Sequence, residues 1–245
     1  MPHLLVEGLN RFDDEPCLFL GDKVASYREV RQSTSQMVQA LQAKGLGKGS
    51  RIAVISANRP EVLSNIAAMQ LAGCIGTPLH PLGSLDDHAY VLEAAEIDAL
   101  VYDASLFDEH AAKLKEKVPG LKHLLGFGPT KTGEDYLALA ATFEPQPLVA
   151  PDVLPDDVSS VNFTGGTTGK PKGVMSTHRV TAYMTQIQMA EWEFPAEVRM
   201  LMATPLSHAA AAFFIPVLQK GGAFYVMQGF SPDEFFDMVE QHRIT

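Results

Sequence analysis

This sequence is most informative where it reads Asn162-Phe163-Thr164-Gly165-Gly166-Thr167-Thr168-Gly169-Lys170-Pro171-Lys172-Gly173. Four glycines, three threonines and two lysines within twelve residues do not suit a packed core. Glycine lets the backbone turn through positive φ and approach a ligand closely, and successive N–H groups in such a turn form an anion-binding concavity. Threonine hydroxyls add hydrogen-bonding groups and lysine adds positive charge. The stretch therefore predicts a loop that holds a polyphosphate.

The spacing of the glycines excludes two common phosphate loops. A Walker A loop has the pattern G-x-x-x-x-G-K-[ST], whereas Gly165 to Gly169 is one residue too short and Pro171 follows Lys170. A dinucleotide-binding loop needs G-x-G-x-x-G, and no frame of this stretch supplies it. The remaining alternative is a glycine-rich hairpin that only joins two strands, and the hydroxyls followed by Pro-Lys-Gly favour phosphate binding over it.

The stretch resembles the phosphate loop of the adenylate-forming enzymes, which include acyl-CoA synthetases, luciferases and peptide-synthetase adenylation domains. The family pattern is aromatic-T-S-G-[ST]-T-G-x-P-K-G, and every fixed position matches except Gly165, which replaces the usual serine. That replacement removes one hydroxyl from the loop and leaves the backbone donors in place.

The resemblance extends over nearly the whole chain. Segments similar to the family occur in the family's order before and after the loop, at 27–30, 41–54, 58–61, 72–81, 176–179 and 205–208. Each of these matches is weak alone, but their shared order makes the resemblance to the family more specific than the loop alone does.

The resemblance implies an activity. Such enzymes join a carboxylic acid to ATP, giving acyl-adenylate and pyrophosphate, and then pass the acyl group to a thiol, usually coenzyme A. ATP, Mg²⁺ and coenzyme A are thus implied, with a fatty or aryl acid as the substrate. The residues that the resemblance places at the ATP phosphates are Thr164, Gly165, Gly166, Thr167, Thr168, Gly169 and Lys172. It makes Thr167 the Mg²⁺ ligand and His208 a residue of the acyl and nucleotide pocket.

Each of these assignments has a structural alternative. The Thr167 hydroxyl could bond to its own backbone in a turn, Lys172 could pin the loop without touching phosphate, and His208 could neighbour a helix N-cap. Lys170 stands at the variable position and is expected to be solvated. No residue of the chain is assigned a catalytic role, because the sequence shows no convincing triad.

The family's adenine-binding, ribose-binding and terminal-lysine motifs are not found after His208. The resemblance therefore implies an N-terminal portion of an acyl-CoA synthetase, cut within its large domain at Thr245, that by itself binds ATP weakly and does not turn over. Two alternatives are an adenylating enzyme that passes the acyl group to a carrier protein and a non-catalytic nucleotide-binding module.

Alternating strand and helix patterns predict an α/β fold with mostly parallel sheets flanked by helices. We expect a first α/β lobe over 1–157, ending in a Pro/Gly-rich connector at about 126–157, and the start of a second lobe over 158–245. A strand over 158–163 should lead into the loop and 173–176 should return antiparallel to it. Asn58 and Ser231 are expected as N-caps of helices that begin at Pro60 and Pro232.

Composition narrows the possible partners. The net charge of −10 over 245 residues argues against nucleic acid or anionic membrane as a general partner. Cys17 and Cys74 are too few for a disulfide framework or metal cluster, so they predict core thiols in a reducing cytoplasm. The N-terminus lacks the pattern of a signal peptide, and no apolar run is long enough to span a bilayer. The oligomeric state is not assigned.

Overall fold

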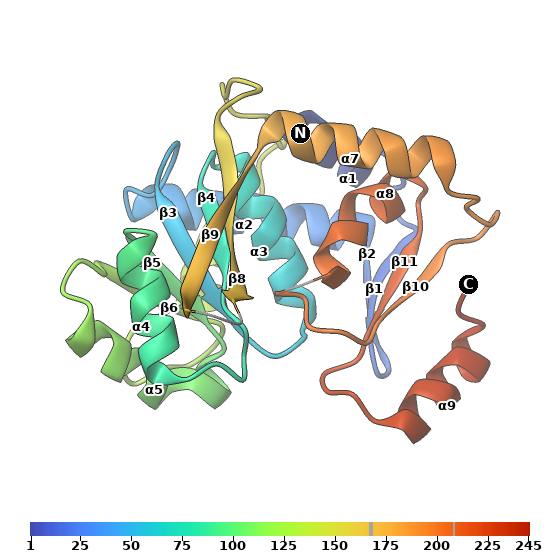
Figure 1. Cartoon of the computed structure of the whole chain (residues 1–245). Helices are drawn as coiled ribbons and strands as arrows, with labels where there is room; N and C mark the ends of the chain where they lie inside the picture. The colour runs from blue at the N-terminus through green and yellow to red at the C-terminus, as the bar shows by residue number, and fades with distance from the viewer. Residues whose placement is uncertain (167–168, 208) are drawn as a thin grey trace.

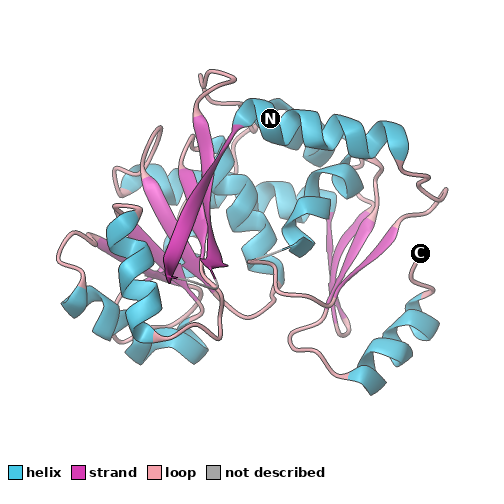
Figure 2. Ribbon diagram, viewed as in Figure 1, coloured by secondary structure: helices cyan, strands magenta, loops and turns pink. Residues whose placement is uncertain are grey.

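A computed structural model of the chain describes residues 1–166, 169–207 and 209–245. These residues form two sheets with helices between and around them (Figures 1 and 2). In chain order the elements are α1 (Pro2–Arg11), β1 (Pro16–Leu20), β2 (Lys23–Ser26), α2 (Tyr27–Ala43), β3 (Arg51–Ile55), α3 (Pro60–Leu71), β4 (Ile75–Pro78), α4 (Leu85–Ala94), β5 (Ala99–Tyr102), α5 (Ala104–Lys117), β6 (His123–Gly126), β7 (Glu134–Asp135), α6 (Tyr136–Ala140), β8 (Val158–Gly166), β9 (Gly169–Thr177), α7 (His178–Glu191), β10 (Arg199–Met202), the 3-10 helix η1 (Ala209–Phe213), α8 (Phe214–Gln219), β11 (Ala223–Val226) and α9 (Pro232–His242).

The larger sheet has the strand order β7-β6-β5-β3-β4-β8-β9, and the smaller one has the order β10-β11-β1-β2. Every neighbouring pair runs parallel except β8–β9 and β1–β2. The expected α/β fold with mostly parallel sheets is confirmed.

Both sheets take strands from both sides of residue 157. β8 joins the larger sheet beside β4, with Gly76 opposite Ser160, and β11 joins the smaller sheet beside β1, with Leu18 opposite Phe224. The division into two lobes at that residue stays a prediction, and the sheets do not follow it.

The larger sheet separates two apolar clusters because successive strand residues point to opposite faces. Ile52 and Val54 of β3 pack into the main core, together with residues of α2, α3 and the smaller sheet. Ala53 and Ile55 pack on the other face, in the cluster formed with α4 and α5. Helices α2 and α3 therefore lie between the two sheets, and α4 and α5 cover the outer face of the larger one (Figure 1).

Of the two expected helix N-caps, Asn58 is wrong and Ser231 is confirmed in position. The N-cap position before α3 is occupied by Arg59, and no side chain caps that end; the Asn58 side chain bonds to distant backbone instead. Ser231 does occupy the N-cap position of α9, but its side chain makes no capping hydrogen bond. Within the described ranges, no helix combines the length and apolarity needed to cross a bilayer.

Helices α4 and α5 meet through a pair of histidines, of which His88 is buried and His110 is partly buried. His88 Nδ1 lies 2.8 Å from His110 Nε2, and His88 Nε2 lies 3.0 Å from the backbone oxygen of His80. Neutral rings satisfy both bonds, with His88 donating to the His80 carbonyl and accepting from His110. Burial is the largest effect and lowers the pKa of His88. The hydrogen bond to the His80 carbonyl and the charge of Asp87 oppose this shift, whereas the His110 and His80 rings add to it. Burial and then Lys113 lower the pKa of His110.

We expect the free energy of unfolding to fall as the pH drops from about 7.5 to about 5.5. Below the ordinary histidine pKa of 6.5 the unfolded chain takes up protons that the folded pair resists, so stability is greatest above that value and is lost on acidification. Urea unfolding at the two pH values measures this. The His110→Gln variant should show a smaller drop, whereas His3→Gln, at an exposed histidine, should behave like the parent. An equal drop in the free energy of unfolding in all three proteins would show that groups other than the His88–His110 pair cause the pH dependence.

Candidate phosphate and acid site

The predicted phosphate loop lies on an antiparallel hairpin formed by β8 and β9. Phe163 pairs with Gly173, Thr164 with Lys172 and Gly166 with Gly169. The expected return strand is therefore confirmed, and it is longer than predicted. The hairpin stands at the edge of the larger sheet, with β8 beside β4 and β9 outermost (Figure 1).

The structure describes only part of the predicted phosphate site. Thr164 and Lys172 lie opposite each other on the two strands and are both exposed, with the Thr164 hydroxyl donating to the Lys172 carbonyl at 3.5 Å. The backbone of Gly165 and Gly166 ends β8, and that of Gly169 begins β9. Three predicted site residues lie outside the described residues, namely Thr167, Thr168 and His208.

Gly173 allows the aromatic residue of the motif to pack across the hairpin. A Cβ atom at Gly173 would lie 3.0 Å from Val161 Cγ1 and 3.2 Å from Phe163 Cζ. A larger residue would push the Phe163 ring away from the strand. Packing at the base of the loop thus explains the first and last residues of the family pattern, Phe163 and Gly173.

Asn58 links the end of β3 to the ends of β10 and β11. Its Nδ2 donates to the carbonyls of Met202 at 3.2 Å, Thr204 at 2.9 Å and Met227 at 3.1 Å, and its Oδ1 accepts from Leu206 N–H at 2.8 Å. The side chain is 6% exposed. It therefore holds the segment before His208 against the larger sheet. Sequence reasoning missed this role because an asparagine before a proline-initiated helix has the local pattern of an N-cap.

A cavity of about 380 Å³ opens beside the hairpin, between the larger sheet and helices α3, α7 and α8. Its walls are mostly apolar, with a minority of hydroxyl and amide groups. Apolar wall residues include Val54, Val62, Ile66, Met69, Val180, Met184, Leu206, Phe214 and Ile215, and polar ones include Ser56, Gln70, Thr77, Ser160, Asn162, Thr185, Gln188 and Ser207.

Three polar atoms of this wall are buried without a hydrogen-bond partner among the described residues: Gln70 Oε1, Thr77 Oγ1 and Ser207 Oγ. Unpaired buried polar groups are rare in folded proteins and call for an explanation such as water or a ligand. Asn162 also lines the cavity and stands two residues before Thr164 on β8. The apolar cavity and the β8–β9 hairpin are therefore adjacent.

Positive charge near the hairpin comes from Lys170 and Lys172, neither of which forms an ion pair within the described part of the chain. Arg59, by contrast, is paired with Glu61 at 3.0 Å and Asp103 at 3.1 Å. The two lysines are thus available to an anion in a protein whose net charge is −10.

Comparison with known proteins identifies the family. The model of the AMP-binding enzymes matches residues 5–245. The chain belongs to this family. The resemblance carried by the phosphate loop is thereby confirmed.

Several relatives of the AMP-binding chain are ligases. It is 48% identical over 249 residues to the medium/long-chain-fatty-acid–CoA ligase FadD8 of Mycobacterium tuberculosis, an alignment that covers 99% of this chain and 44% of the relative. It is 30% identical over 229 residues to a feruloyl-CoA synthase of an Amycolatopsis species, covering 92% of this chain and 43% of that protein. The chain thus spans less than half the length of these relatives.

Solved structures share the fold of this AMP-binding chain. The amide bond synthetase McbA of Marinactinospora thermotolerans superposes with a TM-score of 0.87 at 25% identity, covering all of this chain and 47% of that one. The MbtA protein of Mycobacterium smegmatis superposes with a TM-score of 0.90 at 22% identity, covering 100% of this chain and 46% of that one. The second likeness supports the fold alone.

Proposed function

We propose that this chain is the part of an AMP-forming acyl-CoA synthetase that holds the ATP phosphates and the acyl group. One observation carries the proposal: the hairpin with the phosphate loop adjoins a largely apolar cavity, and Asn162 belongs to both. A carboxylic acid seated in the cavity with its carboxylate toward the hairpin would face the α-phosphate of an ATP held by the loop.

The proposed reaction has two steps. A carboxylate oxygen attacks the α-phosphorus of ATP, the bond to the pyrophosphate oxygen breaks, and acyl-AMP and pyrophosphate form. The thiolate sulfur of coenzyme A then attacks the acyl carbon, and AMP leaves. Loop N–H groups, threonine hydroxyls and Lys172 would stabilise the charge on the departing pyrophosphate, since donors aimed at developing charge lower the barrier.

Mg²⁺ fits this site as an ion held largely by ATP. Mg²⁺ in nucleotide sites takes one or two protein oxygens, with phosphate oxygens and waters completing its shell. The described residues contain no cluster of three or more His, Cys, Asp or Glu side chains suited to a metal, while the loop is rich in hydroxyls. We propose Thr167 as its protein ligand; when bound, Mg²⁺ would neutralise phosphate charge.

We propose a fatty acid as the substrate. The cavity walls are mostly apolar and include three methionines, Met1, Met69 and Met184, whose flexible side chains adapt to a hydrocarbon chain. The relative that is 48% identical is described as a medium/long-chain-fatty-acid–CoA ligase, whereas the one that is 30% identical is described as a feruloyl-CoA synthase. We propose that His208 borders the same pocket and that coenzyme A accepts the acyl group.

We propose the cytoplasm as the compartment. Cys17 and Cys74 are both buried free thiols, and burial raises the pKa of Cys74 to about 12. Protonated core thiols of this kind suit a reducing environment.

Carboxylate-dependent exchange of labelled pyrophosphate into ATP tests the function. The assay is run on residues 1–245 and on the uninterrupted reading frame that contains them, with fatty acids of graded length and with ferulic acid. We expect exchange from the longer protein with fatty acids, followed by thioester formation when coenzyme A is added. We expect the 245-residue chain alone to bind Mg-ATP weakly and to show no turnover. A folded longer protein that exchanges with none of these acids would refute the proposal.

A further inference from the structure

Tyr90 on α4 contacts both strands of the phosphate hairpin. Its hydroxyl donates to the carbonyl of Pro171 at 3.3 Å. Its ring meets that of Phe163 edge-on, with centroids 6.5 Å apart and an interplanar angle of 86°. The Lys170 ammonium lies 5.0 Å from the centre of the same ring.

These contacts flank the loop. Phe163 directly precedes Thr164 on β8, and Lys170 and Pro171 directly follow Gly169 on β9. A single side chain therefore contacts the hairpin just before Thr164 and just after Gly169, on both sides of all the predicted phosphate-binding residues except Lys172. If the loop moved as one rigid piece relative to the sheet, the contacts of Tyr90 would have to break.

The helix that carries Tyr90 is itself firmly placed. Val91 and Leu92 of α4 are buried against the outer face of the larger sheet. The Ser84 hydroxyl caps the start of α4 by accepting from Asp87 N–H. Tyr90 thus ties the hairpin to a rigid element and not to another loop.

The contact with Tyr90 also positions the positive charge of Lys170. The sequence predicts a solvated Lys170, and its side chain is indeed exposed. Its ammonium nevertheless lies over the face of the Tyr90 ring, an arrangement that attracts a cation. It has no carboxylate partner in the described part of the chain, so its positive charge is kept at the base of the loop instead of being neutralised.

We propose that Tyr90 is a positioning residue for the phosphate loop, acting through Phe163, Lys170 and Pro171 to hold the loop where it meets the ATP phosphates. This inference rests on the proposed function of the hairpin as an ATP site. It assigns Tyr90 no contact with substrate.

Steady-state pyrophosphate exchange in the longer protein tests this role, with Tyr90→Leu as the main variant because leucine keeps an apolar side chain on α4. We expect the KM for Mg-ATP to rise about five- to thirtyfold, as loss of one ring-edge and one cation–π contact implies, with the KM for the acid unchanged. Tyr90→Phe keeps both ring contacts and should stay within about threefold of the parent, the size of one hydrogen bond. Lys170→Met, which keeps the tyrosine, should raise the KM for Mg-ATP by a smaller factor than Tyr90→Leu.

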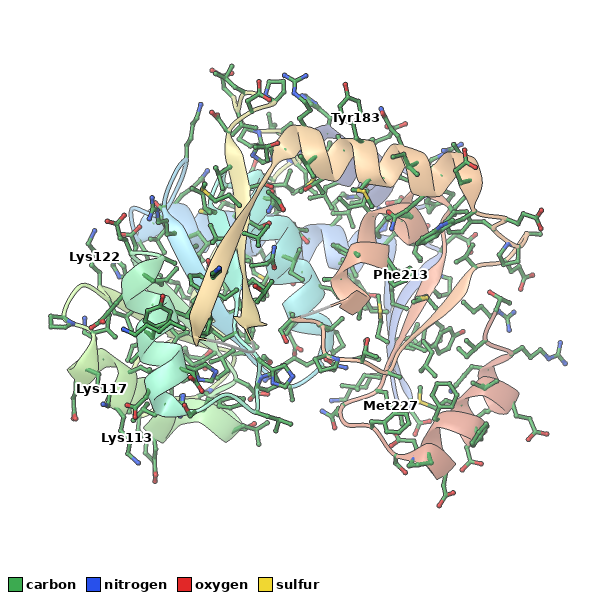
Figure 3. The ribbon with its side chains drawn as sticks, viewed as in Figure 1. Lys113, Lys117, Lys122, Tyr183, Phe213 and Met227 are labelled. Carbon is green, nitrogen blue, oxygen red and sulfur yellow. The ribbon has the colours of Figure 1, made fainter. Side chains whose placement is uncertain are left out.

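Hydrogen exchange gives a readout that does not depend on activity. Tyr90→Leu should speed amide exchange in a peptide spanning 162–173 and leave α4 and β3 unchanged. The matched control is Tyr183→Ala, a tyrosine 56% exposed on the outer side of α7, at the far end of the hairpin (Figure 3). It should change neither the ATP KM nor exchange in 162–173.

The outcomes separate the two proposals. A longer protein with no exchange activity would refute the function, and the hydrogen-exchange result would still decide whether Tyr90 positions the hairpin. Unchanged ATP KM and unchanged amide exchange in Tyr90→Leu would overturn the inference. Equal rises in the KM for ATP and for the acid, with faster exchange over the whole chain or loss of folding, would also overturn it, because they indicate a general packing role.

Discussion

Replacing Thr167 by alanine is expected to slow acyl-adenylate formation about ten- to a thousandfold, the usual cost of losing one group that stabilises transition-state charge. In the proposed mechanism its hydroxyl would help to hold Mg²⁺, which would neutralise phosphate charge, so the effect should appear in the maximal rate at saturating Mg-ATP. Thr167 lies outside the described residues, and the expectation rests on the motif. Pyrophosphate exchange in the longer protein is the measurement.

Two further variants make the Thr167 result specific. Thr167→Ser keeps the hydroxyl and should retain most of the rate. Gly165→Ser restores the family residue and should be tolerated, because a serine adds a hydroxyl without removing a backbone donor. An unchanged rate in Thr167→Ala would reduce Thr167 to a turn residue and remove it from the phosphate site.

Replacing Asn58 by leucine is expected to lower the free energy of unfolding by about 3–5 kcal/mol. The change leaves three carbonyls and the Leu206 N–H without their partner. Each buried group left unpaired costs about 1–3 kcal/mol, and partial relaxation reduces the sum. Because native proteins are stable by only about 5–15 kcal/mol, this is a large fraction of the total.

Thermal and urea unfolding of the Asn58→Leu protein measure the effect, with a drop in melting temperature of about 10 °C expected for a chain of this size. Asn10→Leu, at an exposed asparagine of α1, is the matched control and should stay within about 0.5 kcal/mol of the parent. A loss below about 1 kcal/mol in Asn58→Leu would mean that water replaces the amide and that Asn58 does not hold the segment before His208.

The regular elements with strong local patterns could be predicted from the sequence. The strand that begins at Arg51 and the helix that begins at Pro60 follow from an apolar run and a proline start, and both are present. The hairpin could be predicted because glycine-rich turns commonly join antiparallel strands. Thr164 and Lys172 then face each other as a consequence of strand pairing.

The remainder depends on contacts between residues far apart in the chain. β1 pairs with β11, and Leu18 meets Phe224 only in the folded protein. Asn58 bonds to Met227, a partner that no local pattern reveals. The helical pattern around Tyr90 indicates a helix, yet nothing local predicts that its hydroxyl reaches Pro171.

Transfer of isotopic oxygen from the acid to AMP tests the central claim most directly. The longer protein is given a fatty acid with ¹⁸O in both carboxylate oxygens, together with Mg-ATP and coenzyme A, and the AMP is examined by mass spectrometry. Attack of the carboxylate on the α-phosphorus places one labelled oxygen on that phosphorus, and it stays there when the thiol releases AMP. We predict AMP carrying one ¹⁸O and acyl-CoA carrying the other. Thioester formation with unlabelled AMP, or with ADP in place of AMP, would contradict adenylation at this site.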